Sequence, residues 1–312
     1  MKMIHVLGCV GWAAFFLLAS ASIPFVGPFF SLLTPLPFLY YSTKLGFFQG
    51  VKLAALAIFI IALIAKLAGY PQIIIFATEL GALGFVLSEL FRRNLSLGQA
   101  VFFATAFMVL LGLAFLFLIA HSKNMGPLEM VLNYLRDHLQ ATIEAYKGMG
   151  VPREKAVEFE AFGKMFVDTI ARIYPSLMII GTGFAVWLNI VMARPLFRIG
   201  KLEYPDYFLM DRWQAPEYMV WGVIASGFAL FLLPGGIQLF AINALIIMMA
   251  VYLFHGLSIV LFFLNKYHVP PWIRVGVYML IMIQQLFLGV LALAGLFDQW
   301  VDFRRIHRRL DN

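Results

Sequence analysis

Hydrophobic residues run along this chain in long stretches, with few of the alternating polar positions that mark half-exposed strands. Runs of about 18 to 27 apolar residues are long enough to cross the roughly 30 Å hydrocarbon core of a bilayer as helices. The pattern predicts nine candidate segments: 4–22, 25–41, 47–67, 72–91, 97–120, 173–191, 216–233, 238–264 and 272–297. We therefore expect an all-α, polytopic membrane protein.

Two of these stretches are atypical. The second is interrupted by Pro24, Pro28, Pro35 and Pro37. Backbone broken in this way is tolerated at membrane depth only against protein or a water-filled cavity. The seventh is short and ends in a proline followed by two glycines, at 234–236.

Basic residues in the short loops predict the orientation. Cytoplasmic loops are rich in Lys and Arg, and a cytoplasmic N-terminus places most of the loop Lys and Arg up to Arg212 on that side. Nine complete crossings would export the basic tail FRRIHRR at 303–309. We therefore predict eight to nine membrane segments, with 216–236 as the one that does not cross, and a cytoplasmic C-terminal tail.

Between the fifth and sixth stretches the helical period continues while the composition changes. Apolar residues recur on one helical face in 128–143 and again in 159–173, and Gly148, Gly150 and Pro152 supply a break between the two faces. This pattern predicts an extramembrane amphipathic hairpin over 123–172, on the extracytoplasmic side. The predicted divisions are 1–122 (five membrane segments), 123–172 (hairpin), 173–303 (remaining membrane segments) and 304–312 (basic tail).

Composition supports this class and excludes others. Hydrophobic residues make up 62% and charged residues 12% of the chain, far from globular averages. The net charge of +7 is spread over short loops, so no nucleic-acid surface is expected. The chain has one cysteine, Cys9, and lacks the common catalytic and nucleotide-binding motifs. We expect no enzyme activity, no metal site and no cofactor.

A carboxylate inside the fourth stretch is the main functional candidate. A charged group near the bilayer centre costs on the order of 3 kcal/mol, so Glu79 must face protein or water. It lies on the order of 10 Å from the outer end of its helix. Two interpretations stay open: a hydrogen-bonded carboxyl that ties helices together, or a side chain that faces a ligand. Glu89 is expected to pair with Arg92 or Arg93.

The other polar residues are assigned structural or surface roles. Amides and an imidazole within spans favour hydrogen bonds between helices, although a proton-relay role is open for His255. These residues are Asn189, Asn243, His255 and Gln284. If the last helix continues, its end carries an ion-pair cluster at the membrane surface that favours anionic lipid over a docked partner. The members of that cluster are Asp298, Asp302, Arg304 and Arg305.

Particular motifs resemble known families. FHGLSIVLFFLNKY, GLFDQWVDFRR and DRWQAP are similar to the YybS-like bacterial membrane proteins, a domain of unknown function (DUF2232). This resemblance covers essentially the whole chain and implies a multi-pass membrane protein.

A second resemblance concerns the first six segments. PLPFLYYSTKLGFFQG leading directly into the third segment, and ATELGALGF in the fourth, resemble the substrate-binding S-components of energy-coupling-factor transporters. The resemblance implies an S-component-like six-helix core followed by C-terminal helices. It also implies a solute pocket at the outer ends of the helices, lined by Glu79, Tyr174, Thr182 and Trp187.

Two functions follow from these patterns. The first is a bacterial inner-membrane protein that binds a small molecule or a lipid and has a transport-related role. The alternative is a non-catalytic scaffold or assembly protein that binds a protein partner through 123–172. In either case the lipid bilayer surrounds the chain.

Overall fold

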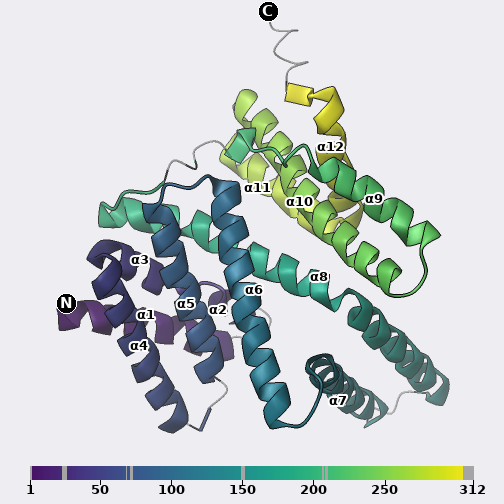
Figure 1. The fold of residues 1–312 in the computed structure, drawn as a ribbon, viewed down its shortest axis with the longest axis horizontal. Helices are drawn as coiled ribbons and strands as arrows, with labels where there is room; N and C mark the ends of the chain where they lie inside the picture. Colours follow the sequence, from purple (N-terminus) through teal and green to yellow (C-terminus); the bar gives the residue numbers. More distant parts are fainter. Residues whose placement is uncertain are drawn as a thin grey trace, which may run out of the picture. The chain divides into compact units, whose positions relative to one another are not determined.

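The fold is helical throughout the described residues, which in the computed structural model are 2–22, 27–67, 69–70, 73–148, 152–205, 207 and 210–304 (Figure 1). The all-α prediction is confirmed. The helices are α1 (Met3–Ser22), α2 (Gly27–Ser31), α3 (Pro35–Leu45), α4 (Phe47–Leu67), α5 (Ile73–Arg92), α6 (Leu97–Ser122), α7 (Pro127–Gly148), α8 (Arg153–Gly200), the 3-10 helix η1 (Met210–Arg212), α9 (Met219–Leu232), α10 (Gly236–Lys266), α11 (Pro271–Ile283) and α12 (Gln285–Val301).

The chain forms two compact units, which we describe separately. The first unit comprises residues up to 135 together with 181–206, and the second comprises 136–180 and the residues from 207 onward. Helix α8 contributes its C-terminal half to the first unit and its N-terminal half to the second.

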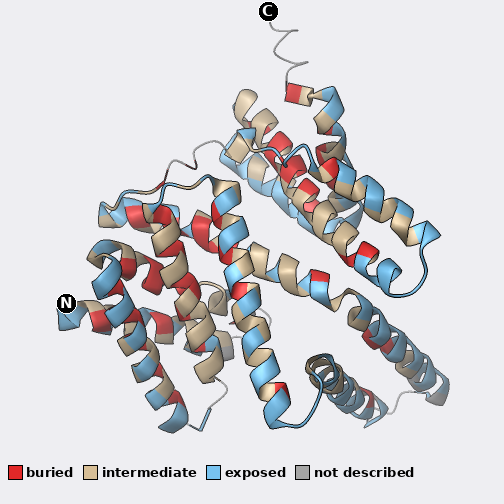
Figure 2. Cartoon of the chain, in the orientation of Figure 1, coloured by how far each residue is buried: buried red, intermediate tan, exposed pale blue. Residues whose placement is uncertain are grey.

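The first unit is built around the short helix α3, in which most residues are buried (Figure 2). Pro35 stands in the first turn of α3, where a proline removes no helical hydrogen bond. Phe38 packs in a cluster with Leu53 and Ala57 of α4 and Ala77 of α5. Gly84 of α5 lies directly against the carbonyl oxygen of Pro35. The proline-broken stretch of the sequence is therefore the core of this unit.

The second unit contains a tight pair of helices, α10 and α12. Gly256 of α10 faces the backbone of Leu291, and Gly295 of α12 faces the carbonyl oxygen of Tyr252. Such close backbone approach is typical of small residues at helix interfaces in membranes. Tyr252 is fully buried and packs with Ala215 and Val220, in the segment before α9 and in α9 itself.

Among the residues that the structure describes, six helices are long and apolar enough to cross a membrane: α1, α4, α5, α6, α8 and α10. Helices α11 and α12 make a seventh only if the bent pair counts as one span, because they meet at 101°. The predicted count of eight to nine segments is thus not confirmed. The predicted span 25–41 is divided between α2 and α3, and 272–297 is broken at Gln284.

That 216–236 does not cross the membrane stays a prediction, and it concerns helix α9. It has 14 residues, a length of about 21 Å at 1.5 Å per residue, which is shorter than the hydrocarbon core of about 30 Å.

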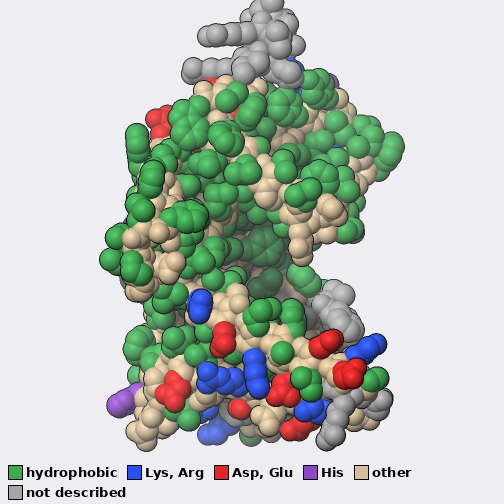
Figure 3. Space-filling view, turned by 90° about the vertical axis from the view of Figure 1, so that its right-hand side faces the viewer, with side chains coloured by type: hydrophobic (Ala, Val, Ile, Leu, Met, Phe, Trp, Pro, Cys, Tyr) green, Lys and Arg blue, Asp and Glu red, His purple; other side chains and the backbone are tan. Residues whose placement is uncertain are grey.

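Helix α8 is far longer than a membrane is thick. Its 48 residues span about 72 Å, against about 40 to 45 Å for a bilayer including headgroups. The predicted boundary between 172 and 173 therefore falls inside one continuous helix. Gly163 of α8 packs against Leu139 of α7, and Glu160 pairs with Lys147 across the hairpin at 3.4 Å. Figure 3 shows charged side chains of both signs gathered over this hairpin, apart from a largely hydrophobic surface.

The α10–α12 contact yields a stability prediction. Gly256→Ala and Gly295→Ala each place a methyl group on backbone atoms that have no room to move, so we expect each to destabilise the protein by about 1–3 kcal/mol. Thermal unfolding in detergent measures the change. Gly289→Ala is the matched control on α12, since nothing lies within 4 Å of its added methyl group. Equal melting temperatures for all three variants would show that α10 and α12 are not in backbone contact.

Candidate functional site

Asn189 is bonded within the first unit. Its side chain is fully buried, and its amide nitrogen donates to the carbonyl oxygens of Leu32 at 2.7 Å and Ala185 at 2.8 Å. The residue thus ties α8 to the turn that precedes α3.

Asn243 of α10 inserts into the hydrogen-bond ladder of α8. Its side-chain oxygen accepts from the backbone N–H of Ser176 at 3.0 Å, and its nitrogen donates to the carbonyl oxygen of Arg172 at 2.8 Å. In a regular helix these two backbone groups would bond each other. The insertion falls beside Pro175, whose missing N–H already interrupts the ladder. Asn243 therefore supports α8 where the helix is weakest.

Gln284 makes no such connection. Its side chain is exposed, and its backbone forms the break between α11 and α12, with its N–H donating to the carbonyl oxygen of Leu280 at 3.0 Å. The residue serves as the bend of the pair.

Glu79 differs from the other polar groups in the spans. It is half-buried on α5, and an added Cβ on Gly112 of α6 would lie 3.8 Å from its Oε1. In the described part of the chain it forms no hydrogen bond and no ion pair. Glu89, ten residues closer to the basic end of α5, pairs instead with Arg92, which also donates to the carbonyl oxygen of Ser42. The Glu79 carboxylate is thus available to accept a hydrogen bond from a group other than the described residues.

The other predicted pocket residues lie along α8. Thr182 and Trp187 are half-buried in the first unit, as Glu79 is, whereas Tyr174 belongs to the second unit. Trp187 stacks obliquely on Phe184, with ring centroids 6.0 Å apart. The grouping of these four residues around one ligand stays a prediction.

Sequence reasoning missed Thr105 of α6. An added Cβ on Gly183 of α8 would lie 3.6 Å from its Oγ1, and this buried hydroxyl has no hydrogen-bond partner among the described residues. Thr105 precedes Gly112 by seven residues, so both lie on one face of α6. The sequence signal that could have identified Thr105 was its seven-residue spacing from Gly112, which places the two residues on one helical face.

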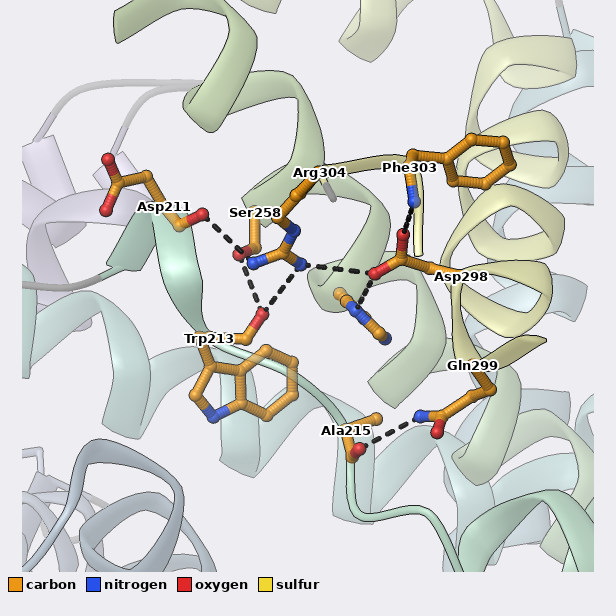
Figure 4. Close-up of polar contacts among 9 residues, drawn as sticks. Asp211, Trp213, Ala215, Ser258, Asp298, Gln299, Phe303 and Arg304 are labelled. Carbon is orange, nitrogen blue, oxygen red and sulfur yellow. Dashed lines mark hydrogen bonds and ion pairs between the residues drawn. The ribbon is translucent and has the colours of Figure 1, made fainter. Parts of the chain in front are cut away.

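A buried charge cluster lies in the second unit (Figure 4). His255 of α10 bonds through Nε2 to Oδ2 of Asp298 on α12 at 3.0 Å. Nη2 of Arg304 lies 3.5 Å from the same oxygen. Oδ1 of Asp298 accepts from the backbone N–H of Phe303 at 2.8 Å. The three ionisable side chains are only 1–5% exposed.

The predicted surface cluster is corrected by this geometry. Asp298 and Arg304 lie in the interior because α12 ends at Val301 instead of continuing through the tail. Asp302 takes a left-handed conformation with φ of 46° and turns the chain back, which brings Arg304 onto Asp298. Arg305 lies outside the described residues. His255 is hydrogen-bonded, as its structural interpretation requires.

Within the described residues no group of three or more His, Cys, Asp or Glu could hold a metal ion. The arrangement offers hydrogen bonding and charge at two places, one around Glu79 and one around His255.

These features define a polytopic helical membrane protein with apolar spans and a small set of buried polar residues. Residues 12–299 match the family model described as "Predicted membrane protein (DUF2232)", so the chain belongs to this family of unknown function. The resemblance to YybS-like proteins is thereby confirmed. The comparisons with curated proteins and with solved structures gave no match. The likeness to S-components stays a prediction.

Proposed function

We propose that this protein is a non-catalytic membrane protein that binds a small solute or a lipid at Glu79, as part of a transport-related role. The observation that carries the proposal is that this carboxyl group has no hydrogen-bond or ion-pair partner among the described residues. Asn189, Asn243, His255 and Asp298 each have protein partners, whereas Glu79 has none among the described residues. Intramembrane ionisable groups without a structural partner are functional candidates by default.

The surroundings of Glu79 restrict the ligand. A carboxylate accepts hydrogen bonds, so the ligand needs an N–H or O–H donor or a positive charge. Gly112 of α6 lies beside Oε1, and Glu79 lies six residues from the start of α5, about 9 Å along the helix. A ligand that enters from the start of α5 would reach the Glu79 carboxylate if it carries a donor or cationic group of modest size.

Ligand-dependent thermal stabilisation of the full chain in detergent tests this proposal. A panel of amine-bearing solutes, vitamins and lipids should include a compound that raises the melting temperature. At 100 times its Kd the compound would stabilise by about 2.7 kcal/mol. Glu79→Gln should abolish the shift because it removes the charge with little change in size, and Glu217→Gln, the same change at an exposed position, should retain it.

Two results would contradict the binding role. One is a panel in which no compound shifts the wild-type melting temperature. The other is a shift of equal size in Glu79→Gln, which would place the ligand elsewhere.

We further propose a bacterial cytoplasmic membrane location, with the N-terminus and C-terminal tail inside and the hairpin outside. Arg92 and Arg93 at the end of α5 and Arg198 at the end of α8 support it, since both helices run toward basic termini. The α7–α8 hairpin lies at the opposite end of α8 from Arg198.

Cysteine labelling in intact cells checks the orientation. Asp137 and Arg93 are both exposed on the protein, so a cysteine at either position can react once the reagent reaches it. In a Cys9→Ser background, an impermeant maleimide added to intact cells should modify Asp137→Cys of the hairpin, which is proposed to lie outside. It should leave Arg93→Cys, proposed to lie inside, unmodified until the cells are opened. The reverse pattern would invert the topology.

A further inference from the structure

The His255–Asp298–Arg304 cluster joins segments of the second unit that lie far apart in the sequence. Nη1 of Arg304 donates to the carbonyl oxygen of Asp211 and Nη2 to that of Trp213, each at 3.1 Å. These carbonyls belong to the 211–215 segment, which precedes α9. Arg304 therefore links the residues that follow α12 to a segment about 90 residues earlier.

Two further hydrogen bonds hold the 211–215 segment in place. Ser258 of α10 donates to the carbonyl oxygen of Trp213 at 2.8 Å, and Gln299 of α12 donates to that of Ala215 at 3.0 Å (Figure 4). Ala215 is buried as a result. Arg304 supplies the only charged side chain in this set, within the residues that the structure describes.

The cluster is electrically neutral in a single arrangement. An ionised Asp298 balances Arg304, and His255 is then neutral, with Nε2 donating to the carboxylate. One added proton leaves a net positive charge in a buried site. An uncompensated buried charge is strongly destabilising because no water solvates it.

The added proton also finds no hydrogen-bond acceptor. Nδ1 of His255 is buried and has no partner among the described residues, and the same holds for the hydroxyl of Tyr252, one helical turn earlier. Protonated imidazole carries donors on both nitrogens. While the 211–215 segment is docked, an added proton on His255 is disfavoured by the net positive charge that it creates and by the lack of a hydrogen-bond acceptor. Solvent would compensate for both once the segment undocks.

We propose that His255 is a proton-binding site that controls the docking of the 211–215 segment. A proton on Nδ1 breaks the neutrality of the cluster, and undocking of Arg304 from Asp298 and from the segment restores solvation. The proposal is independent of any ligand at Glu79.

The other titratable and charged groups near this site lie on the elements packed around it. Tyr252 lies on α10 and Trp213 faces the imidazole ring at 6.2 Å. Asp211 is engaged through its carboxylate by Asn265, which Arg274 of α11 bonds in turn. Helix α9 contains no ionisable side chain. Asp302 at the end of α12 is the remaining carboxylate of the segment that carries Arg304.

A buried reporter cysteine measures the docking directly. In a Cys9→Ser background of the full chain in detergent, Ala215→Cys reports exposure of the segment. Glu217→Cys, two residues further and exposed, corrects for the pH dependence of the thiol and of the maleimide. The ratio of the two labelling rates should rise about tenfold between pH 7.5 and pH 5.5. One bound proton limits this rise to about a hundredfold over two pH units. A ratio that changes less than twofold would overturn the proposal.

Two variants separate proton binding from a purely structural role. His255→Gln keeps a donor for Asp298 but binds no proton, so the ratio should become independent of pH. Arg304→Gln leaves a net negative cluster that one proton neutralises, so its ratio should be higher at pH 7.5 and fall toward pH 5.5. A full rise in His255→Gln, or an unchanged direction in Arg304→Gln, would exclude His255 as the proton-binding group.

Discussion

A polar group inside an apolar span must find its partner within the protein, because lipid offers none. Leaving such a group unsatisfied costs several kcal/mol, and this constraint accounts for most of the polar contacts in the structure. Asn189 bonds the turn before α3, and Asn243 bonds the ladder of α8. Asp298 is bonded by an imidazole, a backbone N–H and a guanidinium. Against this background, a half-buried carboxyl without a partner among the described residues stands out.

Close packing provides the frame for these contacts. Gly84 admits the backbone of α3 against α5, and Gly256 and Gly295 admit α10 against α12. Each contact brings two helices close together. The tight pairing of α10 and α12 in particular positions His255 opposite Asp298. Packing and polar bonding are therefore two parts of one arrangement in each unit.

The sequence predicted the regular spans well. The predicted segments 47–67, 72–91 and 97–120 correspond to α4, α5 and α6 within about two residues, because hydropathy measures the length of an apolar helix directly. The family resemblance was also correct. Hydropathy does not show where a helix bends or continues, so the break at Gln284 and the unbroken α8 were missed. Pro175 is tolerated inside α8, next to the residues that Asn243 bonds, and that partner is 67 residues from Ser176 in the chain.

The candidate sites were predictable only in part. Glu79 was identifiable as a carboxylate in an apolar stretch, but only the structure shows that it has no partner in the described part of the chain. Asp298 and Arg304 were expected at the surface since a continuing helix would place them there, whereas the left-handed turn at Asp302 buries them. Thr105 of α6 lies beside Gly183 of α8, a residue far along the chain, and the sequence gives no sign of this neighbour.

Among the described residues, Glu79 is a carboxyl group without a partner in an apolar setting, while Asp298 is fully engaged. A hydrophobic carbodiimide, which modifies accessible carboxyl groups in membranes, tests both residues in one experiment on the full chain, with mass spectrometry locating the adduct. The account predicts modification at Glu79 and protection of Asp298. Modification of Asp298 with none at Glu79 would contradict it.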